Sequence, residues 1–218
     1  MRIPTVVSSA VALALFPLLG GCTAPPDTGD AASPTASASG ATATTPDDDG
    51  SCGVLDAETI TELAGGPMTE HQETAVGAVP ACQWQNGDMK VQVIQAPAVE
   101  WAVALPAVLE EIKQAPGLGE ENLARIDEGI ELIESGAVDP AAACDMFSVM
   151  SELSGSEPGT DRVVNLLPDG QAPQAISGQA CVDGVYSSVL LVAPGLSKES
   201  EKVSTIGVAL NRLVAAGI

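Results

Sequence analysis

The sequence predicts an α+β fold in which antiparallel sheet, as one sheet or two, is covered by helices. Two stretches with the same order of helix and hairpin motifs support this. An apolar run that ends near Cys22 and a polar stretch without large apolar residues precede them and mark the N-terminal segments. They divide the 218 residues into a signal peptide, a tether headed by Cys22, a first α/β half, a connecting helix and a second α/β half, at 1–21, 22–51, 52–116, 117–138 and 139–218.

Segment 1–21 has the pattern of a secretory signal peptide. Its apolar run, Val6 to Leu19, is too short for a membrane span of about 20 residues and suits a signal core of roughly 7–15. The following letters, LGGC, resemble the lipobox of bacterial lipoproteins. The resemblance implies cleavage before Cys22 and acylation of that residue with chains such as palmitate, which would hold the protein on the extracytoplasmic face of the cell membrane. The alternative is an ordinary cleaved signal followed by a chance cysteine.

The stretch after Cys22 predicts a disordered tether. Up to Ser51 it consists almost entirely of Ala, Thr, Ser, Pro, Gly and Asp, so it cannot form a core. The run Asp47–Asp49 could bind a hard cation, but a solvated charge run is the simpler interpretation.

Charge and aromatic content exclude several partners. With 8 Lys+Arg against 29 Asp+Glu, the net charge of −21 argues against nucleic acid and against direct adhesion to anionic lipid. Contact with the bilayer would therefore be made through acylated Cys22. The chain has 2 Trp, 1 Tyr and 2 Phe, so stacking platforms for sugars or bases are scarce.

Two similar hairpins are predicted, in 81–97 and 180–194. Each begins with Ala-Cys, contains an Asn-Gly or Asp-Gly turn signal, continues with β-branched and aliphatic residues, and ends with Ala-Pro. Further strands are expected around 68–76 and 162–167. Each half therefore has the order α-β-β-β-α, which we interpret as a pseudo-repeat whose C-terminal helices cover equivalent faces.

Helix signals flank both hairpins. Asp56 and Asp139 are expected N-caps of the helices that open the two halves, and Ser197 is the expected N-cap of the last helix. Pro106 should kink or restart the helix that follows the first hairpin. The joining segment 117–138 has apolar residues at helical spacing: Leu123, Ile126, Ile130 and Ile133.

Four cysteines remain after Cys22, and they predict disulfides in an oxidising exterior. Four cysteines permit three pairings. Because each half has one cysteine near its first helix and one at its hairpin, the pairs Cys52–Cys82 and Cys144–Cys181 are favoured. Their spacing contains no CxxC motif, so neither a zinc site nor a thioredoxin-type site is supported.

Position along the elements predicts where three aromatic residues lie. Trp84 has the same strand parity as Cys82, so we expect it in the core beside that bridge. Trp101 lies on the apolar stripe of its helix, which also predicts burial. Tyr186 has the opposite parity to Val185, so it is the aromatic residue expected to be exposed.

The segment CGVLDAETITELAGGP from Cys52, followed by ACQW, resembles actinobacterial cell-envelope lipoproteins with an extracytoplasmic domain of unknown function. The resemblance covers 52–97 well and the rest of the chain loosely. Cys144 departs from the pattern because it lies inside its helix. The resemblance implies a location and no particular chemistry.

The sequence therefore predicts a non-catalytic envelope module without metal or cofactor, which binds a protein, a peptide or a small ligand. His71, the single histidine, stands among polar residues and is interpreted as a surface residue. An apolar-ligand carrier is an alternative, since a pocket could open between sheet and helices. A glycoside hydrolase is the other alternative, and its candidate carboxylate pairs are Glu110/Glu111 and Glu131/Glu134.

Overall fold

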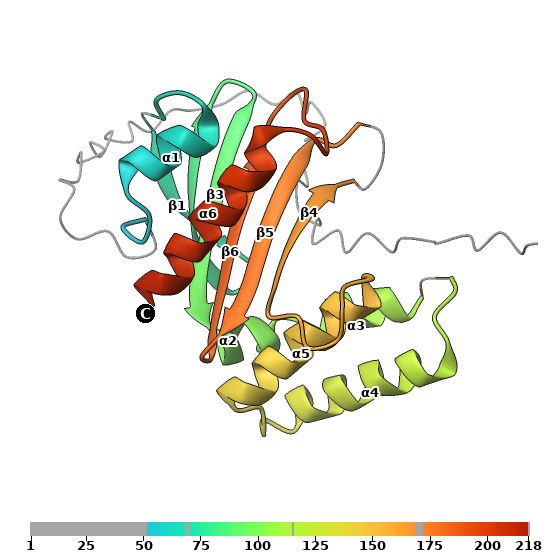
Figure 1. Ribbon diagram of the computed structural model, residues 1–218. Coiled ribbons are helices and arrows are strands. Elements are labelled where there is room, and N and C mark those ends of the chain that lie inside the picture. Colours follow the sequence, from blue (N-terminus) through green and yellow to red (C-terminus); the bar gives the residue numbers. More distant parts are fainter. Residues whose placement is uncertain (1–51, 69, 115, 169–171, 218) are drawn as a thin grey trace, which may run out of the picture.

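A computed structural model describes residues 52–68, 70–114, 116–168 and 172–217. The signal peptide, Cys22 and the tether predicted above lie outside the described residues. Six strands form one antiparallel sheet in the order β1-β2-β3-β6-β5-β4 (Figure 1). The α+β prediction is confirmed, and the strands of both halves share a single sheet because β3 pairs with β6. The strands are β1 His71–Val76, β2 Val79–Asn86, β3 Met89–Pro97, β4 Arg162–Leu167, β5 Ala175–Val182 and β6 Val185–Val192.

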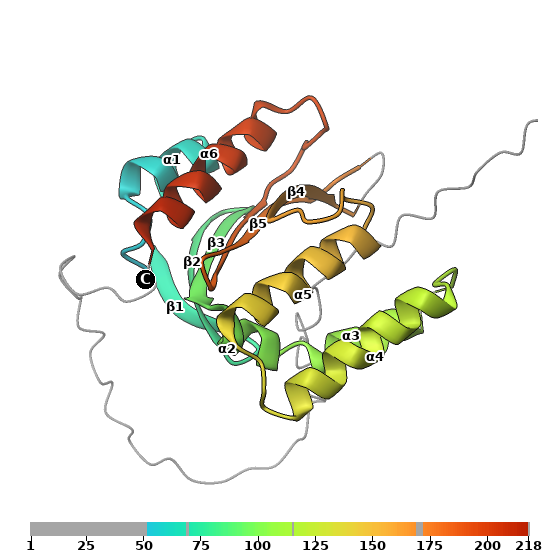
Figure 2. The ribbon, with the colours of Figure 1, turned by 60° about the horizontal axis from the view of Figure 1, so that its bottom comes forward.

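Helices cover both sides of this sheet (Figure 2). We call the side that contacts α1 and α6 face A, and the side that contacts α2 and α5 face B. The pair α3 and α4 packs outside α2 and α5 and extends the core on face B. The helices are α1 Ala57–Ala64, α2 Ala98–Val103, α3 Pro106–Lys113, α4 Glu120–Glu134, α5 Pro140–Leu153 and α6 Glu201–Ala216.

Local signals place most helix ends where the sequence predicts them. Asp56 Oδ1 accepts a hydrogen bond from the Thr59 amide at 2.7 Å, and Asp139 caps α5 in the same way. Pro106 separates α2 from α3 and is the first residue of α3. The prediction of Ser197 as an N-cap is wrong. Its carbonyl accepts the Ser200 amide in a turn, and Ser200 is the N-cap of α6.

The two cores differ in their large side chains. Aliphatic residues dominate face A, where Trp84 packs in the cluster that contains the Cys52–Cys82 bridge, as predicted. On face B the Trp101 and Tyr186 rings stack with centroids 4.7 Å apart, and Phe147 meets both edge-on. The prediction that Tyr186 is exposed is wrong, since it is 3% exposed. The parity reasoning failed because both faces of the sheet are covered at that position.

Both predicted disulfides are present, Cys52–Cys82 and Cys144–Cys181. They lie on opposite faces because the two hairpins differ in register. Cys82 stands five residues before the turn at Gly87, whereas Cys181 stands two residues before the turn at Asp183. The offset of three is odd, and side chains alternate between faces along a strand, so the second cysteine points the other way.

The same offset separates the helices of the two halves. The helix after Pro97 covers face B and α6 covers face A, so the expectation of equivalent faces is wrong. The order of elements recurs as predicted, but the pseudo-repeat is not confirmed. When the hairpins are aligned by their turns, Gly178 takes the place of Cys82. A Cβ there would lie 2.7 Å from Ile206 Cγ2, so this glycine lets α6 pack directly on the backbone of β5.

Candidate functional site

Helices on face B lie toward one end of the strands, where the β5–β6 turn is, and leave the other end less covered (Figure 1). One cross-strand row in that region passes through all six strands, because each member is paired with the next. We call it the polar row. From β1 to β4 its members are Gln72, Gln83, Gln92, Leu190, Ser177 and Asn165.

Five of the six residues in the polar row are half-buried or exposed, and Ser177 is buried. None carries a charge. Each glutamine and asparagine side-chain amide has two N–H donors and an acceptor oxygen. The row can therefore form hydrogen bonds with an uncharged polar chain. A row of six uncharged residues on a partly exposed sheet face is unusual in a chain with 29 acidic residues.

At the β4 end, the polar row opens into a cleft between α5 and strands β4 and β5. The cleft has a volume of about 30 Å³, room for two or three water molecules or the end of one side chain. Among the described residues, no charged side chain lines it. Its walls are apolar at Trp101, Phe147, Met150, Val163 and Leu167 and polar at Ser151, Ser154, Ser156, Asn165, Ser177 and Gln179.

Some polar groups of the cleft already have partners. Gln179 Nε2 donates to Ser177 Oγ at 3.1 Å, and Ser154 Oγ donates to the Met150 carbonyl at 2.9 Å. The first of these bonds holds the Ser177 hydroxyl beside the Gln179 amide, in a cleft that Trp101 and Phe147 also line. The cleft can therefore accept an uncharged group with one apolar side and one polar side.

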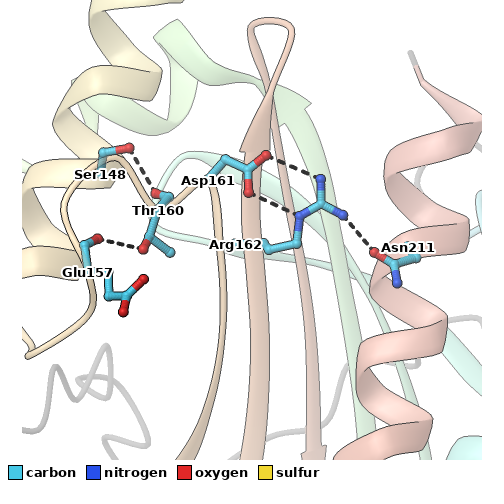
Figure 3. A network of polar contacts seen from close by, with 6 residues as sticks. All are labelled: Ser148, Glu157, Thr160, Asp161, Arg162 and Asn211. Atoms are coloured by element: carbon cyan, nitrogen blue, oxygen red, sulfur yellow. Dashed lines mark hydrogen bonds and ion pairs between the residues drawn. The ribbon is translucent and has the colours of Figure 1, made fainter.

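The start of β4 is fixed to both helical layers (Figure 3). Arg162 pairs with the Asp161 carboxylate and also donates to Asn211 Oδ1 of α6 at 2.8 Å. Ser148 of α5 donates to the Thr160 carbonyl at 2.8 Å. The hydrogen bonds from Arg162 lower the pKa of Asp161, so this carboxylate stays ionised. The edge strand beside the cleft is thereby held in place at one end.

Neither His71 nor the carboxylate pairs considered for a glycoside hydrolase line the cleft. His71 is exposed on β1, as predicted, and its ring centroid lies 6.1 Å from that of Trp84. The candidate pairs Glu110/Glu111 and Glu131/Glu134 are exposed on α3 and α4, and none of the four lines the cleft. Glu110 pairs with Lys113 at 3.1 Å. Within the described residues no group of three His, Cys, Asp or Glu side chains could hold a metal ion.

Sequence reasoning missed both the polar row and the cleft. A signal was present, since Gln83 and Gln92 alternate with apolar residues on their strands. What the pattern lacks is the pairing of β3 with β6, which brings Gln92 beside Leu190 and so joins the two halves of the row.

No protein-family model, curated protein or solved structure matches this chain. In the part of the chain that the structure describes, none of the helices has the length and apolar character needed to cross a membrane.

Proposed function

We propose that this chain is a lipid-anchored, extracytoplasmic binding module of the cell envelope that has no catalytic activity of its own. Its location is supported by the LGGC sequence that ends at Cys22. Two disulfides agree with an oxidising exterior. The binding surface that we propose is the polar row together with the cleft on face B.

One observation carries the binding proposal: an uncharged row crosses the whole sheet and ends at an uncharged cleft. Helices usually cover a sheet face with apolar contacts, yet this region presents amides. Amide side chains bond equally well to donors and acceptors, as peptide groups do. A protein or peptide partner with exposed polar backbone fits this surface best.

The volume of the cleft decides the order in which we place the two alternative functions, the apolar-ligand carrier and the glycoside hydrolase. Sites for small ligands are typically about 300–1,000 Å³, whereas this cleft has about 30 Å³. It can receive one group of a larger partner and is too small for a whole apolar ligand, so the carrier is the second candidate. The hydrolase is third, because its candidate carboxylates lie on α3 and α4 outside the cleft.

The lipid anchor is tested by Cys22→Ser. We expect the wild type to enter the detergent phase and to show the mass of the acylated mature chain. The variant should be released into the medium or remain as uncleaved precursor, while the control Thr28→Ser should behave as wild type. A mature Cys22→Ser protein that still enters the detergent phase would contradict the anchor.

The binding surface is tested with the full chain against an eight-residue peptide library and a set of neutral oligosaccharides. Gln83→Glu and Gln92→Glu each place a charge in the polar row on β2 and β3, and Asn165→Asp places one at its cleft end. A partner that lies across the sheet should bind at least about tenfold more weakly to all three variants, and a partner confined to the cleft end to Asn165→Asp alone. Gln114→Glu, which adds the same charge just after the end of α3, should weaken neither. Binding should change little between low and high salt, because the surface is uncharged. Binders that none of the three polar-row variants weakens, or that Gln114→Glu weakens as much, would reject this surface.

A further inference from the structure

We propose that β4 receives an extended segment of a protein partner as a seventh strand, with one uncharged side chain of that segment seated in the cleft. The inference rests on the proposed function, since it uses the cleft end of the same surface. It names the partner as a peptide strand and its main recognition as backbone hydrogen bonding.

β4 is the last strand of the sheet among the described residues. The Cys181 amide donates to the Asp161 carbonyl at 2.9 Å, and the Gln174 amide donates to the Leu167 carbonyl at 2.8 Å. Backbone groups in an antiparallel ladder alternate in direction. Those of Arg162, Val164 and Leu166 therefore point away from β5, toward the free edge.

The other edge strand, β1, is better protected than β4 against pairing with another chain. β1 carries exposed His71 and Glu73, and a charge on an edge strand discourages pairing with another chain. After Arg162, β4 continues as Val-Val-Asn-Leu-Leu, with Val164 37% exposed. The run Val163–Leu167, between Arg162 and Pro168, has no charge and no proline, and such an apolar edge is a template for strand addition.

An added strand would place alternate side chains on face B. Val163, Asn165 and Leu167 of β4 line the cleft, so the partner side chain opposite Asn165 would lie at its mouth. Backbone pairing would supply affinity and the cleft would supply specificity, as in other cases of strand addition. The volume and the lining favour a small uncharged side chain such as Val, Ala, Thr or Ser.

Charge favours a different protein over a second copy. The carboxylates of Glu157 and Asp161 lie at the Arg162 end of β4 (Figure 3). Two copies of a chain with net charge −21 repel each other, and edge-to-edge pairing would bring their acidic surfaces together.

The test uses the full chain and peptides selected from the eight-residue library. Val164→Pro removes an outward amide and blocks the edge without removing a bond to β5. Glu73→Pro is the matched control on β1: the Gln85 amide donates to the Glu70 carbonyl, so the Glu73 amide also points outward. We expect Val164→Pro to weaken binding about tenfold or more and Glu73→Pro to leave it unchanged.

A second measurement examines the peptide. Methylating every second backbone nitrogen of the peptide should abolish binding when the methylated amides are those that face β4. Methylating the other amides should preserve binding, since only alternate amides of an added strand face β4. Near-ultraviolet circular dichroism and intact disulfides would show that both proline variants are folded. If Val164→Pro unfolds the chain, the methylation pattern together with Asn165→Asp, which places a charge at the cleft, decides the question.

The alternative outcomes separate the two proposals. Peptides that lose binding with Gln83→Glu but not with Val164→Pro would overturn strand addition and leave the polar row as the binding surface. Binding of neutral oligosaccharides without any peptide would do the same. A concentration-dependent dimer that Val164→Pro abolishes would identify a second copy of this chain as the molecule that pairs with β4. It would overturn the proposal of a different protein partner. Absence of all binding would overturn both proposals.

Discussion

Neighbouring rows on opposite faces of the sheet show how one set of strands carries two kinds of surface. The face A row directly beside the polar row consists of His71, Trp84, Val91, Leu191, Ile176 and Leu166. Each member adjoins a member of the polar row along the chain. Val91, Leu191 and Ile176 are fully buried under helices, whereas Gln92 and Leu190 are only half-buried.

This difference explains where the helices lie. α6 covers face A across β4, β5 and β6, and Gly178 lets it approach the sheet closely. On face B the residues at the same level are mainly polar, so a helix there would bury amides without partners. The described helices on face B are therefore confined to the end where Tyr186 and Trp101 pack, and the rest of this face is the surface that we propose for binding.

Among the tests of this comparison, removal of one disulfide should have the largest effect on the free energy of unfolding. Replacing Cys52 and Cys82 by Ala, or Cys144 and Cys181 by Ala, should each lower the free energy of unfolding by about 4 kcal/mol, because the two closed loops are of similar length. The bridges lie on opposite faces, so each double variant should retain the other bridge. Denaturant unfolding and non-reducing peptide mapping measure both effects. New pairings in either variant would show that the two faces do not fold independently.

Features encoded locally could be predicted from the sequence. The hairpin turns, the caps Asp56 and Asp139 and the break at Pro106 each depend on a few adjacent residues. The disulfide pairs followed from the order of elements in each half. Local pattern therefore predicted the elements and their class.

Features that depend on pairing between the halves could not be predicted. The β3–β6 register places Gln92 beside Leu190 and decides which residues form the polar row. The prediction for Tyr186 failed because parity alone does not tell which faces are covered. The register offset between the hairpins, visible as the distance from each cysteine to its turn, was in the sequence and would have predicted that the bridges lie on opposite faces.

A matched pair of leucines tests the contrast directly. Leu191→Ala on face A removes a fully buried side chain and should cost about 2–5 kcal/mol. Leu190→Ala on the polar row removes the same group from a half-buried position and should cost less than about 1 kcal/mol. Chemical denaturation of both variants compares them. Equal losses would mean that the polar row is covered and is not a binding surface.

The smallest expected effect concerns the covered end of face B. Tyr186 is buried and hydrogen-bonded to the side chains of Ser188 and Trp101, so Tyr186→Phe should cost about 1 kcal/mol at neutral pH. Burial raises the pKa of Tyr186 to about 12, above the usual value of about 10. The neutral phenol is favoured in the folded state, so its stabilising contribution is complete below pH 10 and is lost as the pH rises toward 12.

Tyr186 is the only tyrosine, which makes the measurement specific. Tyrosinate absorbance of the folded chain should appear only near pH 12, or when the chain unfolds, and should be absent in Tyr186→Phe. The difference in unfolding free energy between wild type and variant should shrink between pH 10 and pH 12, because other alkaline titrations are common to both. Ionisation near pH 10 with the fold intact would place Tyr186 in contact with water. The uncovered part of face B would then extend past the Ser188 level to the β5–β6 turn, and the boundary drawn between the two ends of this face would be wrong.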